Sequence, residues 1–183
     1  MNGHHLILGE LIDFLTGETI PDTHDERYRQ KIAKRLFEKR GYAKTEIQSR
    51  CNLQIKVDEK CAIIKVDFKI TLNGRIYMII KYGPGSIVTR RRPALAAARL
   101  LAPTQIPVVV VTNGEAAEIL DGSSGEIIAH GLEAIPSKIE ILDMVPENAF
   151  RLIAPPRFEV ESRILYAFEV DGSCPCDDSI CRL

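Results

Sequence analysis

The stretch KVDFKITLNGRIYMIIKYGP, residues 65–84, contains two strand-like runs joined by an Asn-Gly pair, and it decides how the fold is predicted. Apolar and polar residues alternate on both sides of the turn, as in strands with one buried face. A two-residue turn would mix these faces, so we expect a three-residue connection that ends at a left-handed Gly74. That register places Asp67 opposite Ile79 and diagonal to Lys81, with all three side chains on one face.

The segments around this hairpin predict an α/β fold with a mixed sheet. Apolar residues at a helical spacing indicate a helix over residues 24–40, where Thr23 and Glu26 fit a reciprocal capping box. The β-branched run IPVVVV is typical of a strand covered on both faces. The expected order is the first helix, an antiparallel three-stranded meander (52–57, 61–71 and 75–82), a helix from Pro93 to Leu101, the covered strand, a short helix or turn after Gly114, a strand at EIIAHG, and helices near 137–144 and after Pro156.

Three regions are expected along the chain. Residues 1–22 are predicted to form an N-terminal helical arm, because the apolar residues from Leu8 to Leu15 follow a helical spacing. Residues 23–150 are predicted to form the main domain, in which helices flank the sheet. Residues 151–183 are predicted to form a C-terminal helix and a tail that contains cysteines.

Composition predicts a soluble globular protein. The 183 residues are 45% hydrophobic and 27% charged, and no apolar run approaches the roughly 20 residues that span a bilayer. We therefore expect a cytoplasmic protein with no membrane segment. The five cysteines are an odd number that favours reduced thiols over a disulfide framework. Because the net charge is −1, any binding of nucleic acid must depend on a local basic patch.

Asp67 and Lys81 match part of the residue set that metal-dependent nucleases use. Such enzymes hold Mg²⁺ with carboxylate oxygens, and a nearby lysine stabilises the charge that develops on the phosphate. A frequent arrangement has an aspartate on one strand and Glu-x-Lys on the next. The alternative is that Asp67 and Lys81 form a solvated cross-strand ion pair.

Three segments together carry a resemblance to a known family: GELIDFLTGETIPDTHDERYRQKIAKRLFEKRGY, the hairpin quoted above, and PALAAARLLAPTQIPVVVVTNGEAAEILDGSSGE. Over residues 8 to about 145 the chain resembles the N-terminal nuclease domain of type I restriction enzyme R subunits, and the stand-alone bacterial and archaeal proteins that carry this domain. The resemblance implies a restriction-endonuclease-like PD-(D/E)xK fold. It also implies that Asp67 and Lys81 are catalytic and that Glu26 and Asp67 are ligands of Mg²⁺.

Two positions depart from the family pattern. Ile79 stands where the Glu-x-Lys motif has its acid, and Pro93 stands about where the family often has a glutamine. Because isoleucine cannot coordinate a metal, Mg²⁺ binding is expected to be weak, and the protein is expected to be a weakly active or inactive endodeoxyribonuclease. For Glu26, a capping role alone would explain its position.

Arg90, Arg91 and Arg92, together with Lys81, are the candidate residues for binding nucleic acid, with DNA as the expected partner. Three adjacent arginines can instead form a solvated loop. The chain has no Gly-x-x-x-x-Gly-Lys loop, which excludes the ATP-driven motor itself. The functional hypotheses are a DNA-associated nuclease-like protein and a non-enzymatic module that binds nucleic acid or another subunit of a restriction–modification system.

The C-terminal tail contains Cys174, Cys176 and Cys181. Three nearby thiols can bind zinc or an iron–sulfur cluster, but this spacing is a weak signal. A thiol-bearing tail without a metal is the favoured interpretation.

Overall fold

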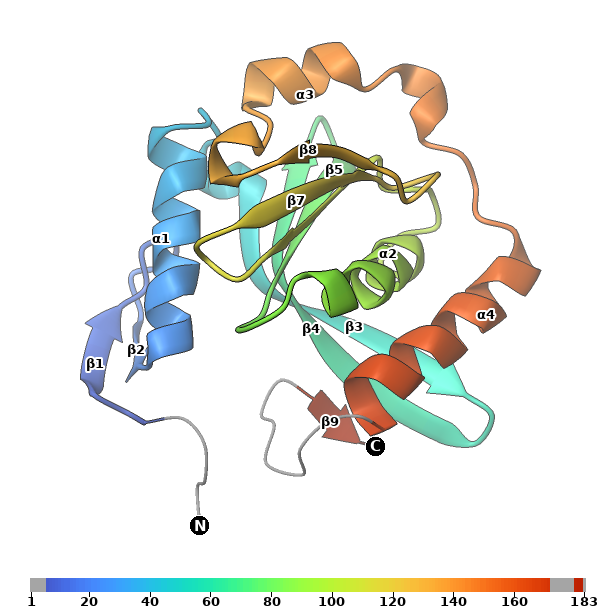
Figure 1. Cartoon of the computed structure of the whole chain (residues 1–183), viewed down its shortest axis with the longest axis horizontal. Coiled ribbons are helices and arrows are strands. Elements are labelled where there is room, and N and C mark those ends of the chain that lie inside the picture. The colour runs from blue at the N-terminus through green and yellow to red at the C-terminus, as the bar shows by residue number, and fades with distance from the viewer. Residues whose placement is uncertain (1–5, 172–179, 183) are drawn as a thin grey trace.

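The protein has a mixed α/β fold, and the computed structural model describes residues 6–171 and 180–182 (Figure 1). Six strands form a sheet in the order β3-β4-β5-β6-β7-β8, and a further strand, β9, pairs with β4. Among the described strands only β5 and β6 form a parallel pair, because the chain between them crosses over through a helix. The bounds are β3 (Ile47–Val57), β4 (Lys60–Leu72), β5 (Arg75–Tyr82), β6 (Val108–Thr112), β7 (Ala117–Asp121), β8 (Ile127–His130) and β9 (Ile180–Arg182).

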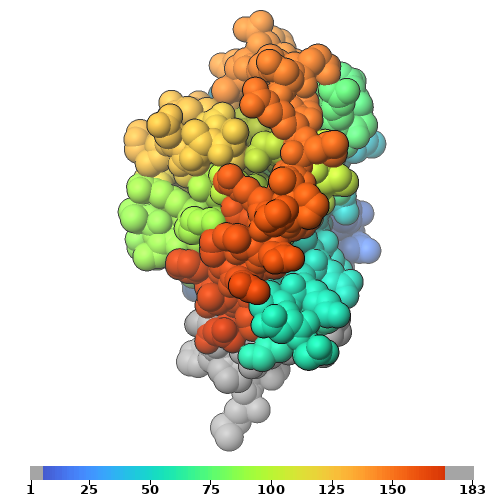
Figure 2. All heavy atoms as spheres, turned by 90° about the vertical axis from the view of Figure 1, so that its right-hand side faces the viewer, coloured from blue at the N-terminus to red at the C-terminus, as the bar shows by residue number. Residues whose placement is uncertain are grey.

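Helices cover both faces of this sheet. The α-helices are α1 (His24–Glu38), α2 (Arg91–Leu100), α3 (Lys138–Met144) and α4 (Pro155–Tyr166), the last continued by a π-helical turn over Ala167–Asp171. Short 3-10 helices lie at Lys44–Glu46, Val88–Arg90, Leu132–Ala134 and Glu147–Ala149. Residues of α1 and α3 pack in one apolar core, and residues of α2 and α4 pack in a second. In Figure 2, α4 lies between the β3–β4 hairpin and the segment around α2.

The antiparallel meander and the covered strand are confirmed. Strands β3, β4 and β5 pair in sequence order, and all five residues of β6 are buried. The predicted strand at EIIAHG and the helices near 137–144 and after Pro156 are also present. A turn follows Gly114 as one of the two predicted alternatives, held by the Asn113 side chain, but the segment AEILD after it forms β7 between β6 and β8, a strand that the prediction missed.

The start of α1 follows half of the predicted capping box. The Thr23 Oγ1 accepts a hydrogen bond from the Glu26 backbone N–H at 3.1 Å, which satisfies one free amide of the first turn. The Glu26 carboxylate does not complete the box, because it accepts hydrogen bonds from Gln30 and Arg50. Glu26 therefore joins α1 to β3.

The predicted helical arm over residues 1–22 is wrong where the structure describes it. Strands β1 (Gly9–Ile12) and β2 (Thr19–Asp22) form an antiparallel hairpin, seen beside α1 in Figure 1. The Asp13 Oδ1 accepts hydrogen bonds from the backbone N–H groups of Leu15 and Thr16, both at 2.9 Å. This side-chain capture of two amides, with Gly17 at φ +77°, favours a turn over a helix.

The connection between β4 and β5 differs from the prediction by one residue. Gly74 has a positive φ as expected, but Asn73 has one too, and Leu72 pairs directly with Arg75 across a two-residue turn. A β-bulge then inserts Tyr77, so that Ile70 pairs with Met78 and Phe68 with Ile80. The bulge keeps the apolar faces of the two strands together. The prediction had expected a three-residue loop to have this effect.

Within the described residues, no helix combines the length and the apolar character that a membrane crossing requires.

Candidate functional site

Asp67 lies on β4 with both carboxylate oxygens occupied. Its Oδ1 accepts a hydrogen bond from the Arg29 Nε of α1 at 2.7 Å, and its Oδ2 accepts one from the Tyr82 backbone N–H at 2.8 Å. The Arg29 guanidinium also lies 5.0 Å from the centre of the Tyr82 ring. Asp67 is 7% exposed, so these contacts are shielded from bulk water. The aspartate therefore fixes the end of β5 and anchors α1 to the sheet.

A second group of polar residues lies beside Asp67, between the β1–β2 turn, α1 and β3. The Arg50 guanidinium donates hydrogen bonds to Asp13 Oδ2 at 2.8 Å and to Glu26 Oε1 at 2.6 Å. The Gln30 amide donates to the same two carboxylates, at 3.0 and 2.9 Å. Asp13 and Glu26 are only 2% and 8% exposed. The space that these side chains enclose is about 10 Å³, which is close to the minimum for one water molecule.

Arg29 and Arg50 balance the negative charges of Asp13, Glu26 and Asp67. Burial raises the pKa of Asp13, but hydrogen bonds from Thr16, Arg50, Gln30 and Leu15 outweigh it and lower the pKa to about 2. Burial lowers the pKa of Arg29, yet the neighbouring Asp67 and Glu26 carboxylates raise it overall. Carboxylates and guanidinium groups thus stabilise one another in their charged forms.

A Mg²⁺ ion does not fit this arrangement. The ion requires about six oxygen ligands in near-octahedral geometry. Each Asp67 oxygen already accepts a hydrogen bond, one from Arg29 and one from the Tyr82 amide, and Arg29 also lies 3.9 Å from the other candidate ligand, Glu26. In the part of the chain that the structure describes, no group of three or more His, Cys, Asp or Glu side chains could hold a metal. The prediction of Glu26 and Asp67 as ligands is therefore not supported by their contacts.

Lys81 lies on β5 and is 8% exposed. Its Nζ donates a hydrogen bond to the Lys65 carbonyl oxygen at 3.0 Å and lies 3.4 Å from the Glu169 Oε2. Glu169 belongs to the turn after α4, which the sequence did not identify as part of a site. No local pattern indicates this contact, because the two residues are 88 positions apart.

Ile79 is placed differently from the prediction. It is 0% exposed and packs in the apolar core with α2 and α4, and it pairs with Lys69 and not with Asp67. The expectation that Ile79 occupies a polar face between Asp67 and Lys81 is wrong. The bulge at Tyr77 gives Ile79 Lys69 as its partner, and Ile79 is buried because residues of α2 and α4 cover its face of the sheet.

The three adjacent arginines make contacts within the protein. Arg91 pairs with Glu118, and the Arg92 Nη1 lies 2.6 Å from Glu161 Oε2. The Arg90 Nη2 donates a hydrogen bond to the Pro84 carbonyl oxygen at 3.0 Å. Binding of DNA by this run stays a prediction, and it would have to compete with these contacts.

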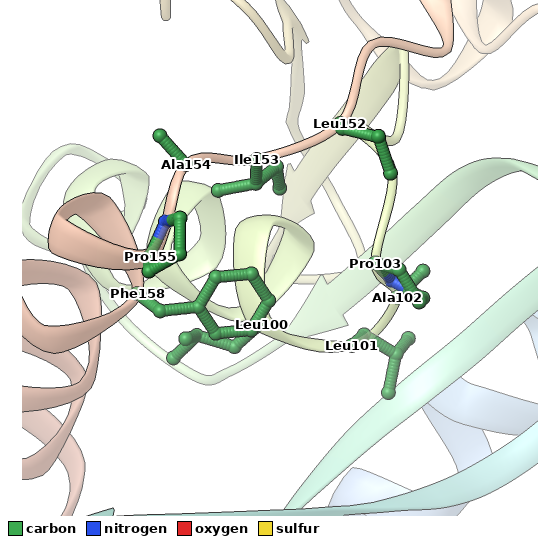
Figure 3. Close-up of a pocket in the computed structure, with 9 residues that line it drawn as sticks. All are labelled: Leu100, Leu101, Ala102, Pro103, Leu152, Ile153, Ala154, Pro155 and Phe158. Carbon is green, nitrogen blue, oxygen red and sulfur yellow. The ribbon is translucent and has the colours of Figure 1, made fainter.

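A groove of about 610 Å³ lies between the C-terminal end of α2 and the start of α4 (Figure 3). Its lining consists of residues 100–103, residues 152–155 and Phe158, all apolar. Because no acid, base or nucleophile lines it, the groove has no means of catalysis.

The cysteines add no site within the described residues. Cys51 is buried and Cys61 is partly buried, and both are free, as expected for reduced thiols. The side chains of Cys174, Cys176 and Cys181 lie outside the described part of the chain.

Comparison with known proteins identifies the family. No curated protein and no solved structure matches the chain. Residues 24–136, more than half of the chain, match the family described as type I restriction enzyme R protein N terminus. This range contains α1, the β3–β5 meander, α2 and strands β6–β8, and therefore also Asp67 and Lys81. The chain belongs to the family of type I restriction enzyme R protein N-terminal domains.

Proposed function

We propose that the protein is a DNA-associated, nuclease-related module of a restriction–modification system, and that it does not hydrolyse DNA. The observation that carries this proposal is the engagement of Asp67, whose two oxygens bind Arg29 and the Tyr82 amide. A nuclease of the PD-(D/E)xK type would use this carboxylate to bind a divalent ion.

The other residues of the expected site support the same conclusion. The Lys81 ammonium is bound by Lys65 and Glu169, so it is not free to stabilise charge on a phosphate. Glu26 is held by Arg50 and Gln30. Each group that would act in hydrolysis already has a partner within the protein.

Association with DNA is supported by the charge of the first helix. Residues 24–40 contain seven Arg or Lys and three Asp or Glu, although the whole chain has a net charge of −1. Lys31, Lys34 and Lys39 on this segment are exposed, as is Lys44 after it. The Nζ atoms of Lys34 and Lys44 lie 5.9 and 4.1 Å from the centre of the Phe14 ring. Exposed ammonium groups beside an aromatic ring suit a phosphate backbone.

Fluorescence anisotropy with duplex DNA at several salt concentrations tests the association. We expect affinity to fall with salt, and we expect Lys31→Ala/Lys34→Ala to reduce the salt dependence by roughly 0.9 per lost phosphate contact. The matched control is Lys56→Ala/Lys60→Ala, which removes two exposed lysines from the β3–β4 hairpin. If no binding occurs at low salt, DNA association is refuted, and a module that binds a protein of the restriction–modification system becomes the better hypothesis.

Plasmid nicking with Mg²⁺ and with Mn²⁺, alongside a calorimetric titration of each metal, tests the absence of hydrolysis. We expect no nicking and no heat of metal binding. Nicking that requires a metal and is abolished by Asp67→Ala would refute the proposal.

A further inference from the structure

Exposed apolar side chains are concentrated on the segment from α3 to the start of α4. Ile139 of α3 and Leu152 before α4 are each 81% exposed, and Leu142 and Met144 of α3 are exposed as well. Figure 2 shows this segment, in orange, along one face of the molecule. Single exposed apolar residues are ordinary, but four within residues 139–152 are typical of a surface that contacts another molecule.

Helix α3 is apolar on its outer side as well as on its inner side. On the inner side Ile141 is fully buried in the core that α3 shares with α1. A surface helix normally has polar residues opposite its buried face, whereas Ile139 and Leu142 of α3 are exposed. The helix cannot use them to fill the apolar groove of its own chain, because Leu100 and Leu101 of that groove pack against the other core, with α2 and α4.

The groove of about 610 Å³ is formed before anything enters it. In Figure 3, Leu152 and Phe158 lie at opposite ends of its apolar lining. Its two walls are joined by backbone hydrogen bonds, because the Ile153 N–H donates to the Pro103 carbonyl at 3.1 Å and the Gln105 N–H donates to the Arg151 carbonyl at 2.8 Å. Since the walls are already fixed, binding of an apolar side chain there costs little conformational entropy.

Charge divides this surface into an acidic half and a basic half. Residues 139–149 contain three acidic residues and no Lys or Arg, whereas residues 150–158 contain two arginines and no acidic residue. Asp143 is exposed on the acidic half, and Arg151 is exposed on the basic half. A surface with acid at one end and base at the other is complementary to a second copy of itself that is turned about a two-fold axis.

We propose that residues 139–158 form the interface of a symmetric dimer, in which the exposed apolar side chains of α3 in each copy enter the groove of the other. In this arrangement Asp143 of each copy faces Arg151 of the partner subunit. A second copy is the partner that fits, because this chain itself supplies both the acidic apolar helix and the basic apolar groove. The dimer goes beyond the proposed function and does not depend on it, since neither Asp67 nor the lysines of α1 belong to this surface.

Sedimentation equilibrium over roughly 1–500 μM protein measures the Kd of the dimer. We expect the wild type to dimerise within this range, and we expect Ile139→Ser and Leu152→Ser each to raise the Kd at least about 10-fold, because each substitution acts twice in a symmetric dimer. The matched control is Val88→Ser, which removes an exposed apolar side chain outside residues 139–158 and should leave the Kd unchanged. Circular dichroism checks that each variant folds.

Charge reversal tests the two-fold arrangement. Asp143→Arg alone and Arg151→Glu alone should each raise the Kd at least about 5-fold, because two attractive pairs in the dimer become repulsive. The two single variants mixed in equal amounts should form a heterodimer, in which each arginine again faces a carboxylate. The double variant Asp143→Arg/Arg151→Glu should dimerise like the wild type, because both pairs are restored with their charges exchanged.

A wild type that stays monomeric up to the highest concentration would overturn the proposal. A dimer that neither Ile139→Ser nor Leu152→Ser weakens would also overturn it, because the contact would then lie elsewhere. Charge variants that weaken the dimer but do not recover on mixing would refute the pairing of Asp143 with Arg151. None of these measurements uses DNA, so their failure leaves the proposed function as it stands.

Discussion

Replacing Asp13 by Asn should destabilise the protein in a manner that depends on pH. Asp13 joins the β1–β2 turn to α1 and β3, and its side chain accepts hydrogen bonds from four groups. These interactions lower its pKa from 3.8 to about 2. Asparagine keeps the shape and one acceptor oxygen but removes the charge, so the substitution isolates the contribution of the carboxylate.

The size of the effect follows from the shift in pKa. Lowering the pKa of Asp13 from 3.8 to about 2 corresponds to about 2.5 kcal/mol of stability at neutral pH. Because the pKa of Asp13 is lower in the folded state, this stabilisation is fully present above the unfolded-state pKa. It is lost as the pH falls from about 4 towards 2. Asp13 is 2% exposed, so solvent screening does not remove the effect.

Urea unfolding followed by circular dichroism at pH 7, 5, 3.5 and 2.5 measures this contribution. We expect the variant to be less stable than the wild type by about 2.5 kcal/mol at pH 7 and pH 5, with a difference that shrinks at the two lower values. The control is Asp22→Asn, which removes an exposed pair with Arg27 and should have little effect. A difference that is equal at pH 7 and pH 2.5 would show that the charge of Asp13 is not what stabilises the turn.

Three further substitutions test other parts of the structure, each by urea unfolding. Ile79→Glu should lower stability by about 3 kcal/mol or more, because the side chain is fully buried among apolar residues; a stable variant would contradict this burial. Glu161→Gln should lower stability by about 3–5 kcal/mol, because it leaves Arg92, Arg99 and Arg157 without their shared carboxylate. The control Glu159→Gln, on the exposed side of α4, should have little effect. Gly83→Ala should lower stability by about 1 kcal/mol or less, since the overlapping Arg90 guanidinium is the end of a flexible side chain, and Arg90→Ala should remove that loss; additive effects of the two changes would contradict the contact.

Local signals in the sequence predicted much of the fold. The Thr23 cap, the apolar spacing of α1 and the β-branched run of β6 depend on residues close in sequence, and each element was placed within a few residues. The helix near 137–144 begins with a reciprocal capping box between Ser137 and Glu140, which is again a local feature. The alternation in β4 and β5 also indicated the hairpin and the left-handed Gly74.

Features that depend on distant contacts were not predictable in this way. The segment that forms β7 contains Glu and Ala, which favour helix, but pairing with β6 and β8 determines its structure. The apolar spacing from Leu8 to Leu15 suggested a helix, yet Asp13 within it is bound by Arg50 of β3, which is 37 positions away. The contact between Lys81 and Glu169 likewise joins residues that are 88 positions apart. A pattern of side chains along one strand contains no information about which distant residue will face it.

The hairpin also shows why a retained aspartate is a poor test of nuclease activity in this chain. Asp67 has a structural role that requires no metal, because it binds the last amide of β5 and holds Arg29 against the ring of Tyr82. Its presence is therefore explained whether or not hydrolysis occurs. Lys81 is explained in the same way, because its ammonium group donates to the Lys65 carbonyl and lies 3.4 Å from Glu169, contacts that require no catalysis. For a chain of this family, the strand register between the aspartate and the motif should be established before any position is assigned to the acid.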